Sequence, residues 1–215
     1  MYLNLLAKLP KLTKNLIVKK VRIMTLKEST MLKLGTKAID FSLPDPQGTK
    51  FTLEQVKGIQ GLLVMFICNH CPYVKHIQQA LVAACNSYIR QAVGVVAINS
   101  NDIVSHPDDA PEKMAEFSQE SGFAFPYLFD EDQSVAKLYS AACTPDFFLF
   151  DQELKLVYRG RFDESTPGNG KPVTGKDLQQ AVGHLINHEQ PLSQQFPSMG
   201  CNIKWKAGNA PDYFN

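Results

Sequence analysis

Two cysteines separated by two residues carry the strongest chemical signal in the sequence. Cys68 and Cys71 enclose Asn69-His70, follow an apolar run over residues 62–67 and precede a stretch with helical spacing. The two lie about one helical turn apart, so a disulfide can join them. Free N–H groups at the start of a helix favour a thiolate, the attacking species in thiol–disulfide exchange. The pattern therefore predicts redox chemistry, with Cys68 as the thiol nearest the helix end.

His70, between the two cysteines, is predicted to tune their chemistry. A partly cationic imidazole lowers the pKa of a neighbouring thiol and makes the pair more oxidising. Two alternatives stay open on the local pattern: an inert buried pair, or a zinc site in which Cys68 and Cys71 need further ligands. The zinc interpretation takes these ligands from Cys143, His76 and Cys201.

Strands and helices that alternate along the chain must position the cysteines. Buried strands are predicted over 62–67 and 93–99, and an amphipathic helix over 73–91 joins them, so the strands run parallel. The polar residues after the second strand reach the same sheet edge as the cysteines. An ordinary turn explains each of them equally well. As candidate site residues they are Asn99, Asn101 and Asp102.

Elements on either side complete the predicted sheet. Residues 38–45 and 50–53 read as a short hairpin, which its prolines restrict to a sheet edge. Residues 147–150 and 154–161 read as a second, antiparallel hairpin. A last helix is predicted over 175–189, with Thr174 as its cap.

The second hairpin predicts positive charge near the cysteines. Its first strand starts at the cysteine edge, so the return strand brings Arg159 and Arg161 back toward that edge. An arginine there stabilises a thiolate or binds an anionic group of a substrate. We select Arg161 as the candidate; a solvated arginine at a strand end is the alternative.

The order of these elements and three motifs resemble the thioredoxin fold, in its redoxin or AhpC/TSA branch. The motifs are Phe41-Ser42-Leu43-Pro44-Asp45 with Gly48, Phe66-x-Cys68-x-x-Cys71, and Thr144-Pro145 before an apolar strand. The resemblance covers residues 34–190. It implies an α/β, thioredoxin-like fold with a central mixed β-sheet flanked by helices, an N-terminal β-hairpin extension and an irregular C-terminal tail.

The resemblance also implies roles for residues outside the Cys-x-x-Cys motif. Thr144-Pro145 looks like the family's cis-proline segment, where the backbone of Thr144 pairs with an extended substrate. The tail around Cys201 resembles that of a peroxiredoxin-like subgroup. Cys143 and Cys201 are therefore candidate auxiliary thiols, and burial in the core is an equal alternative for Cys143.

The sequence departs from the peroxiredoxin pattern where a peroxide-binding hydroxyl is expected. That pattern, Pro-x-x-x-Thr/Ser-x-x-Cys, has a hydroxyl residue three positions before the reactive cysteine, but Met65 precedes Cys68 and Cys68 precedes Cys71 at that distance. Thiol–disulfide exchange is therefore our leading hypothesis, with Cys68 attacking and Cys71 resolving. A thiol peroxidase with Cys143 or Cys201 resolving is the alternative, and a non-catalytic zinc module is the third hypothesis.

The composition limits the kinds of binding partner that we expect. A formal net charge of +1 and the lack of a basic aromatic motif argue against nucleic acid, and no apolar run is long enough to span a bilayer. Five cysteines, an odd number, suit a cytoplasmic protein better than a secreted disulfide scaffold. We expect protein or small-molecule disulfides or thiols, or hydroperoxides, as substrates, a thioredoxin- or glutathione-type electron donor, and no cofactor.

The two ends of the chain differ from the central domain. Residues 1–33 are rich in lysine and leucine, with Glu28 as the single acid and Pro10 interrupting the apolar pattern. This is not the pattern of a signal peptide. We expect a disordered basic extension, or sequence upstream of the true start, followed by the redoxin domain over 34–190 and a tail over 191–215.

Overall fold

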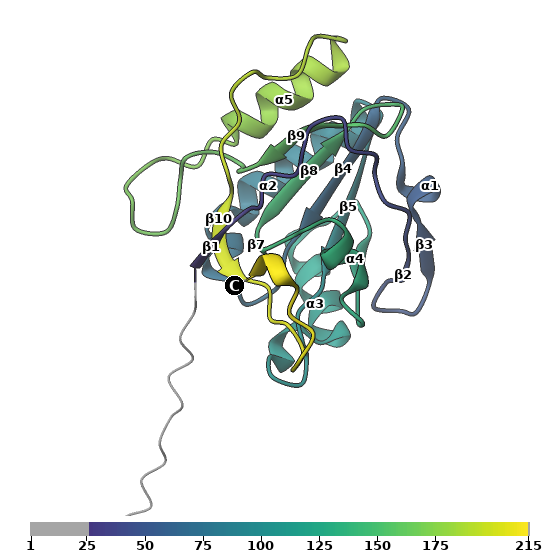
Figure 1. Ribbon diagram of the computed structural model, residues 1–215, viewed down its shortest axis with the longest axis vertical. Helices are drawn as coiled ribbons and strands as arrows, with labels where there is room; N and C mark the ends of the chain where they lie inside the picture. Colours follow the sequence, from purple (N-terminus) through teal and green to yellow (C-terminus); the bar gives the residue numbers. More distant parts are fainter. Residues whose placement is uncertain (1–25, 215) are drawn as a thin grey trace, which may run out of the picture.

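A five-stranded mixed sheet organises the chain in the computed structural model, which describes residues 26–214 (Figure 1). Its strand order is β6–β5–β4–β8–β9. The central strands β4 and β5 are parallel, as predicted, and β6 continues the parallel set. Strand β8 is antiparallel to both β4 and β9, which confirms the second hairpin. The bounds are β4 (Gly61–Phe66), β5 (Val93–Asn99), β6 (Tyr127–Phe129), β8 (Asp146–Phe150) and β9 (Leu156–Gly160).

Strand β4 is buried on both faces, because its side chains alternate between two cores. Leu63 and Met65 pack in a core with side chains of three helices: α2 (Pro72–Arg90), α3 (Pro111–Ser121) and α5 (Lys176–Ile186). Leu62, Val64 and Phe66 pack in the opposite core. That core also holds side chains of β2 (Ser42–Pro44), α1 (Leu53–Val56) and α4 (Ser134–Leu138). Strand β2 pairs with β3 (Lys50–Thr52) as the predicted entry hairpin.

A smaller antiparallel sheet joins both ends of the described chain. Its order is β1–β10–β7, with β1 (Leu26–Glu28), β10 (Met199–Asn202) and β7 (Cys143–Thr144). Figure 1 shows β1, in purple, beside β10, in yellow. The last residues of the expected basic extension and part of the expected irregular tail are therefore ordered strand. Residues 1–25 of that extension lie outside the described residues.

One predicted detail of the helices, the cap of α5, differs from the structure. Helix α5 has Gly175 as its N-cap, in the left-handed region at φ +67°, and Thr174 precedes it instead of capping it. Helix α4 ends at Leu138 because the backbone turns at Ser140, where φ is +52°. Within residues 26–214, no helix combines the length and the apolar character needed to cross a membrane.

Candidate thiol redox site

The Cys-x-x-Cys motif lies where β4 ends and α2 begins, at the edge of the sheet that the sequence predicts. Helix α2 starts at Pro72, so Cys71 is its N-cap residue. Cys68 lies three residues earlier. The structure therefore corrects the assignment of Cys68 as the thiol nearest the helix end. Both cysteines are buried: Cys68 is 1% exposed and Cys71 is 0% exposed.

Cys71 sits at the centre of a group of sulfur contacts. Its Sγ lies 2.9 Å from the Sγ of Cys201 and 3.2 Å from the carbonyl oxygen of Thr144. Burial alone would raise the pKa of the Cys71 thiol, but hydrogen bonds from the Cys201, Cys68 and Thr144 side chains lower it well below its ordinary value. Negative charge in this cluster is therefore favoured on Cys71.

The other two thiols of the cluster have the opposite tendency. Burial, the hydrogen bond to Cys71 and the charge of Asp109 raise the pKa of Cys68. The hydrogen bond to Cys71, together with burial, raises the pKa of Cys201. Both thiols therefore stay protonated beside one thiolate, which is the charge distribution that thiol–disulfide exchange needs.

Thr144 faces the cluster from across the sheet edge. Its hydroxyl oxygen lies 3.4 Å from the Sγ of Cys68, and the peptide bond between Thr144 and Pro145 is cis. The structure thus brings Thr144 and Pro145 to the cysteines, where the resemblance implied that they lie. It also supplies a hydroxyl group that local spacing around Cys68 and Cys71 does not provide.

A buried carboxylate, Asp109, organises the loop that carries the motif. It accepts hydrogen bonds from the backbone N–H of Asn69 at 2.9 Å and from the side-chain amide of Asn101 at 2.8 Å. Its Oδ2 also lies 2.6 Å from the Nδ1 of His70. His70 is therefore held by a carboxylate as well as lying beside the thiols, and the sequence analysis did not identify Asp109.

The predicted polar residues after β5 belong to the same network. Asn99 donates its side-chain amide to the backbone carbonyl of Asp109, and Asn101 connects Asp109 to the backbone N–H of Lys204. Asp102 instead accepts bonds from Val104 and Ser105 in its own turn. These residues support the motif loop and the tail; none of the three touches a sulfur through a described hydrogen bond.

The predicted auxiliary residues separate into two groups. Cys201 reaches the cluster, whereas the Sγ of Cys143 lies 3.6 Å from the carbonyl oxygen of Pro145, between β7 and β8. Arg161 forms an ion pair with Asp177 at 2.6 Å and stacks on Phe196. It lines a cavity of about 330 Å³ together with Pro145, but its described contacts are not with a cysteine.

One group of potential metal ligands occurs among the described residues. Cys68, His70 and Asp109 offer ligand atoms within 4.8 Å of one another. This set differs from the one predicted for zinc. The carboxylate of Asp109 already accepts two hydrogen bonds and lies against His70, so interactions within the protein explain its position.

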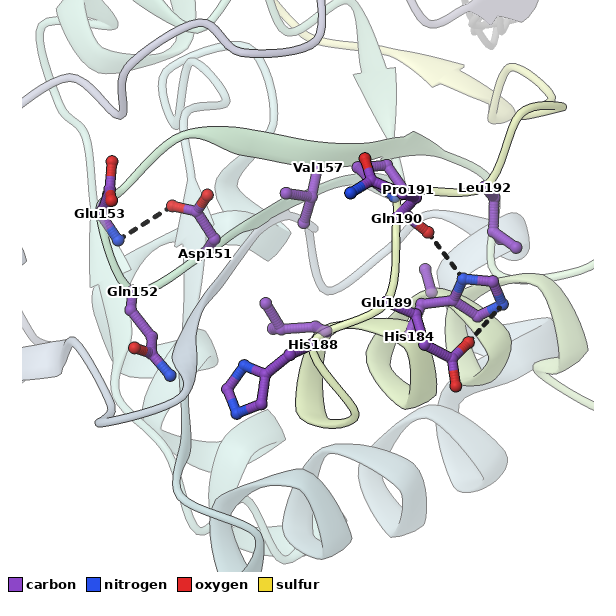
Figure 2. Close-up of a pocket in the computed structure, with 12 residues that line it drawn as sticks. Asp151, Gln152, Glu153, Val157, His184, His188, Glu189, Gln190, Pro191 and Leu192 are labelled. Atoms are coloured by element: carbon purple, nitrogen blue, oxygen red, sulfur yellow. Dashed lines mark hydrogen bonds and ion pairs between the residues drawn. The ribbon is translucent and has the colours of Figure 1, made fainter.

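A second cavity, of about 340 Å³, lies at the opposite end of the sheet, between the β8–β9 turn and the end of α5 (Figure 2). Figure 2 shows His184 between the carbonyl of Gln190 and the carboxylate of Glu189, with Asp151 on the turn. No cysteine lines this cavity. The redox site is therefore at the other end of the sheet.

Comparison with known proteins is consistent with this site. Residues 34–159 match the AhpC/TSA family over more than half of the chain. The chain belongs to the AhpC/TSA family. A solved structure of an uncharacterized conserved protein from Geobacillus kaustophilus is 49% identical, covers 85% of this chain and 97% of its own, and superposes with a TM-score of 0.83.

Named relatives of this AhpC/TSA member are redox proteins of two kinds. It is 27% identical to a Mycobacterium tuberculosis protein called "Putative peroxiredoxin", over 77% of this chain and 98% of that protein. It is 28% identical to the thiol-disulfide oxidoreductase ResA of Geobacillus kaustophilus, over 62% of this chain and 73% of that protein. A solved thioredoxin domain from Bacteroides vulgatus, 19% identical with a TM-score of 0.50, shares the fold. The chain is thus similar to thiol-dependent redox enzymes on a thioredoxin fold.

Proposed function

We propose that this protein is a thiol–disulfide oxidoreductase whose reactive thiolate is Cys71 and whose first dithiol–disulfide couple is Cys68/Cys71. The observation that carries the proposal is the position of Cys71 at the N-cap of α2, in contact with the thiol of Cys201. The N–H groups of the first helical turn and the neighbouring thiol donors favour the charged sulfur. This assignment exchanges the predicted roles of Cys68 and Cys71.

The chemistry follows from that charge distribution. The Cys71 thiolate attacks one sulfur of a substrate disulfide, and the other substrate sulfur leaves as a thiolate. The Cys68 thiol then loses its proton and attacks Cys71, which releases the second substrate thiol and leaves a Cys68–Cys71 disulfide. A dithiol donor of the thioredoxin or glutathione type restores the reduced protein. In this cycle His70 and Arg161 tune the thiols, and Thr144 with Pro145 positions the substrate.

The setting of this cycle is proposed to be the cytoplasm. Support comes from the odd number of cysteines and from the low-pKa thiolate, which a reducing compartment returns to its active form. The substrates that we expect are small-molecule or protein disulfides.

A reduction assay with matched variants tests the proposal. We expect the reduced protein to reduce a small aromatic disulfide, and the Cys68→Ala variant, which lacks the proposed resolving thiol, to reduce it more slowly than wild type. The Cys85→Ala variant, which removes a buried thiol in the middle of α2, serves as the control and keeps the wild-type rate. A Cys68→Ala protein that cycles at the wild-type rate without a new internal disulfide would contradict the couple.

Peroxide reduction is a second candidate, favoured by one observation. The Thr144 hydroxyl lies 3.4 Å from the Cys68 sulfur, so a hydroxyl reaches the site from β7 although none is present in the motif. In this reaction the attacking thiolate becomes a sulfenic acid, and a second cysteine condenses with it to a disulfide and releases water. Stopped-flow mixing with hydrogen peroxide decides between the two: consumption no faster than by free cysteine removes an antioxidant role.

A further inference from the structure

The tail of this protein lies along the edge of β7 that an extended substrate would otherwise use. Strand β10 pairs antiparallel with β7, with Cys201 opposite Thr144 and Asn202 opposite Cys143. An unpaired strand edge beside a reactive group is a docking place for an extended peptide, because main-chain hydrogen bonds supply most of the affinity. Here the chain's own strand fills that edge.

The close approach of β10 is built into its sequence. A side chain at Gly200 would collide with the backbone carbonyl of Thr144, so only glycine lets the strand lie this near. Ser198 donates its hydroxyl to the carbonyl of Pro145 on one side of the strand. On the other side Ile203, 1% exposed, donates its backbone N–H to Ala142. The tail is thus anchored at both ends of the segment that carries Cys201.

The anchored strand brings a third sulfur to the thiolate. The Sγ atoms of Cys71 and Cys201 are 2.9 Å apart, closer than a van der Waals contact but longer than a disulfide bond of about 2.05 Å. Cys201 is 1% exposed, so this contact is enclosed by the protein. A movement of less than about 1 Å by the two sulfurs along this line is enough to form the bond.

We propose that Cys201 is the third redox thiol of this site, held by β10 as a built-in partner that competes with Cys68 for a disulfide bond to Cys71. The proposal rests on the proposed function, because it assigns a second resolving thiol to the same thiolate. The protein then has two oxidised forms, one with Cys68–Cys71 and the other with Cys71–Cys201.

The two oxidised forms interconvert by an internal exchange. The Cys201 sulfur, after loss of its proton, attacks Cys71; the Cys71–Cys201 bond forms and the Cys68–Cys71 bond breaks. Cys68 leaves with the bonding electron pair and takes up one proton. The number of disulfides stays constant, so the exchange needs no oxidant or reductant.

The second oxidised form has a structural consequence. Its disulfide ties β10 to the N-cap of α2, and while the tie exists an extended peptide has no free backbone edge at Thr144. Cys68 is then free as a thiol. In this form we expect the site to react only with substrates that do not pair with the β7 strand.

Peptide mapping of the oxidised full-length protein tests the inference. Cleavage after lysine releases Cys68 and Cys71 in one peptide, residues 58–75, and Cys201 in another, residues 177–204. After oxidation with a small disulfide and trapping in acid, we expect wild-type protein to yield two products: an internally bridged 58–75 peptide and a 58–75 peptide linked to 177–204. The linked product should persist in the Cys68→Ala variant and disappear in the Cys201→Ala variant.

The outcomes separate this inference from the proposed function. An internal bridge in Cys201→Ala with no linked product in either wild-type or Cys68→Ala protein overturns the role of Cys201 and leaves the Cys68/Cys71 couple intact. No internal bridge in Cys201→Ala overturns the couple itself. The Cys85→Ala control should give the wild-type pair of products. If a variant fails to fold, fragmentation of the linked wild-type peptide, which identifies whether Cys68 or Cys71 is bridged, decides instead.

Discussion

Helix α2 carries two buried cysteines in opposite chemical environments. Cys71 caps its N-terminus, and Cys85 lies in its middle among apolar side chains of the core; both residues are 0% exposed. Burial raises the pKa of Cys85. The pKa of Cys71 falls instead, because hydrogen bonds from three side chains outweigh burial. Equal burial therefore gives an inert thiol at one position and a thiolate at the other, and the nearby donors decide which.

The donors at the N-terminus of α2 come from distant parts of the chain. Cys68 belongs to the motif, Thr144 to β7 and Cys201 to β10. The middle of α2 shows no such convergence, since burial is the cause that shifts the pKa of Cys85. A thiolate site in this fold thus depends on tertiary pairing as much as on the Cys-x-x-Cys spacing.

The largest difference between the two regions should appear when each thiol is removed. We expect Cys71→Ala to lower the rate of disulfide reduction by at least about 100-fold, because both proposed disulfides contain this sulfur. Cys85→Ala should stay within about twofold of wild type. The measurement is the initial rate with a small aromatic disulfide, with circular dichroism as a check on folding. A comparable loss of rate in a folded Cys85→Ala protein would contradict the conclusion that Cys85 is inert.

Removing the Cys201 thiol should bring the pKa of Cys71 closer to that of Cys85. The Cys201 hydrogen bond lowers the pKa of Cys71, so Cys201→Ala should raise that pKa. A thiolate exists above its pKa, so the midpoint of its ultraviolet absorbance should move to higher pH. Since a hydrogen bond to a charged group contributes about 1.5–3 kcal/mol, the thiolate population at the original midpoint should fall by about tenfold or more. An unchanged titration curve would show that Cys201 is not a donor.

Sequence patterns were sufficient for the elements whose signals are local. The apolar runs of β4 and β5, the amphipathic spacing of α2 and the turn of the β8–β9 hairpin each lie within one short window, and the structure confirms them. Even the N-cap position of Cys71 had a local signal. Proline is favoured at the first helical position, so Pro72 makes the preceding residue the cap. The prediction that Cys68 is the thiol nearest the helix end was therefore wrong, although the helix itself was expected to follow Cys71.

Non-local pairing explains what the sequence could not specify. Cys201 reaches Cys71 only because β10 pairs with β7, across more than 50 residues, and a short tail strand has no periodic signal. Asp109 and Asp108 are adjacent acids in one 3₁₀ turn, and nothing in the sequence distinguishes the buried one from the exposed one. Their difference arises from the donors that the folded loop directs at Asp109.

That pair of acids allows a matched test of the loop before α2. Asp109→Asn replaces a carboxylate that accepts from Asn69 and Asn101 on its two oxygens, and lies against His70, with an amide that has one oxygen to accept with. We expect a loss of about 2 kcal/mol in the free energy of unfolding, measured by urea denaturation. Asp108→Asn, at the exposed neighbour, should change it by less than about 0.5 kcal/mol. Equal values for the two variants would mean that the Asp109 network adds no stability to the thiol region.

The smallest expected effect concerns one hydroxyl donor. Thr144→Val keeps the shape of the β7 side chain but removes the hydroxyl beside Cys68, whose hydrogen bonds lower the pKa of both Cys68 and Cys71. A single hydrogen bond contributes about 1 kcal/mol, so disulfide reduction at about pH 7 should slow by about fivefold, with the rate recovering at higher pH as the thiols ionise. Thr144→Ser, which keeps the hydroxyl and loses only a methyl group, should retain the wild-type pH profile. If serine and valine slow the reaction equally and without a shift in the pH profile, Thr144 contributes packing against β10 and not a hydrogen bond. In that case Cys201 and Cys68 remain as the donors that distinguish Cys71 from Cys85.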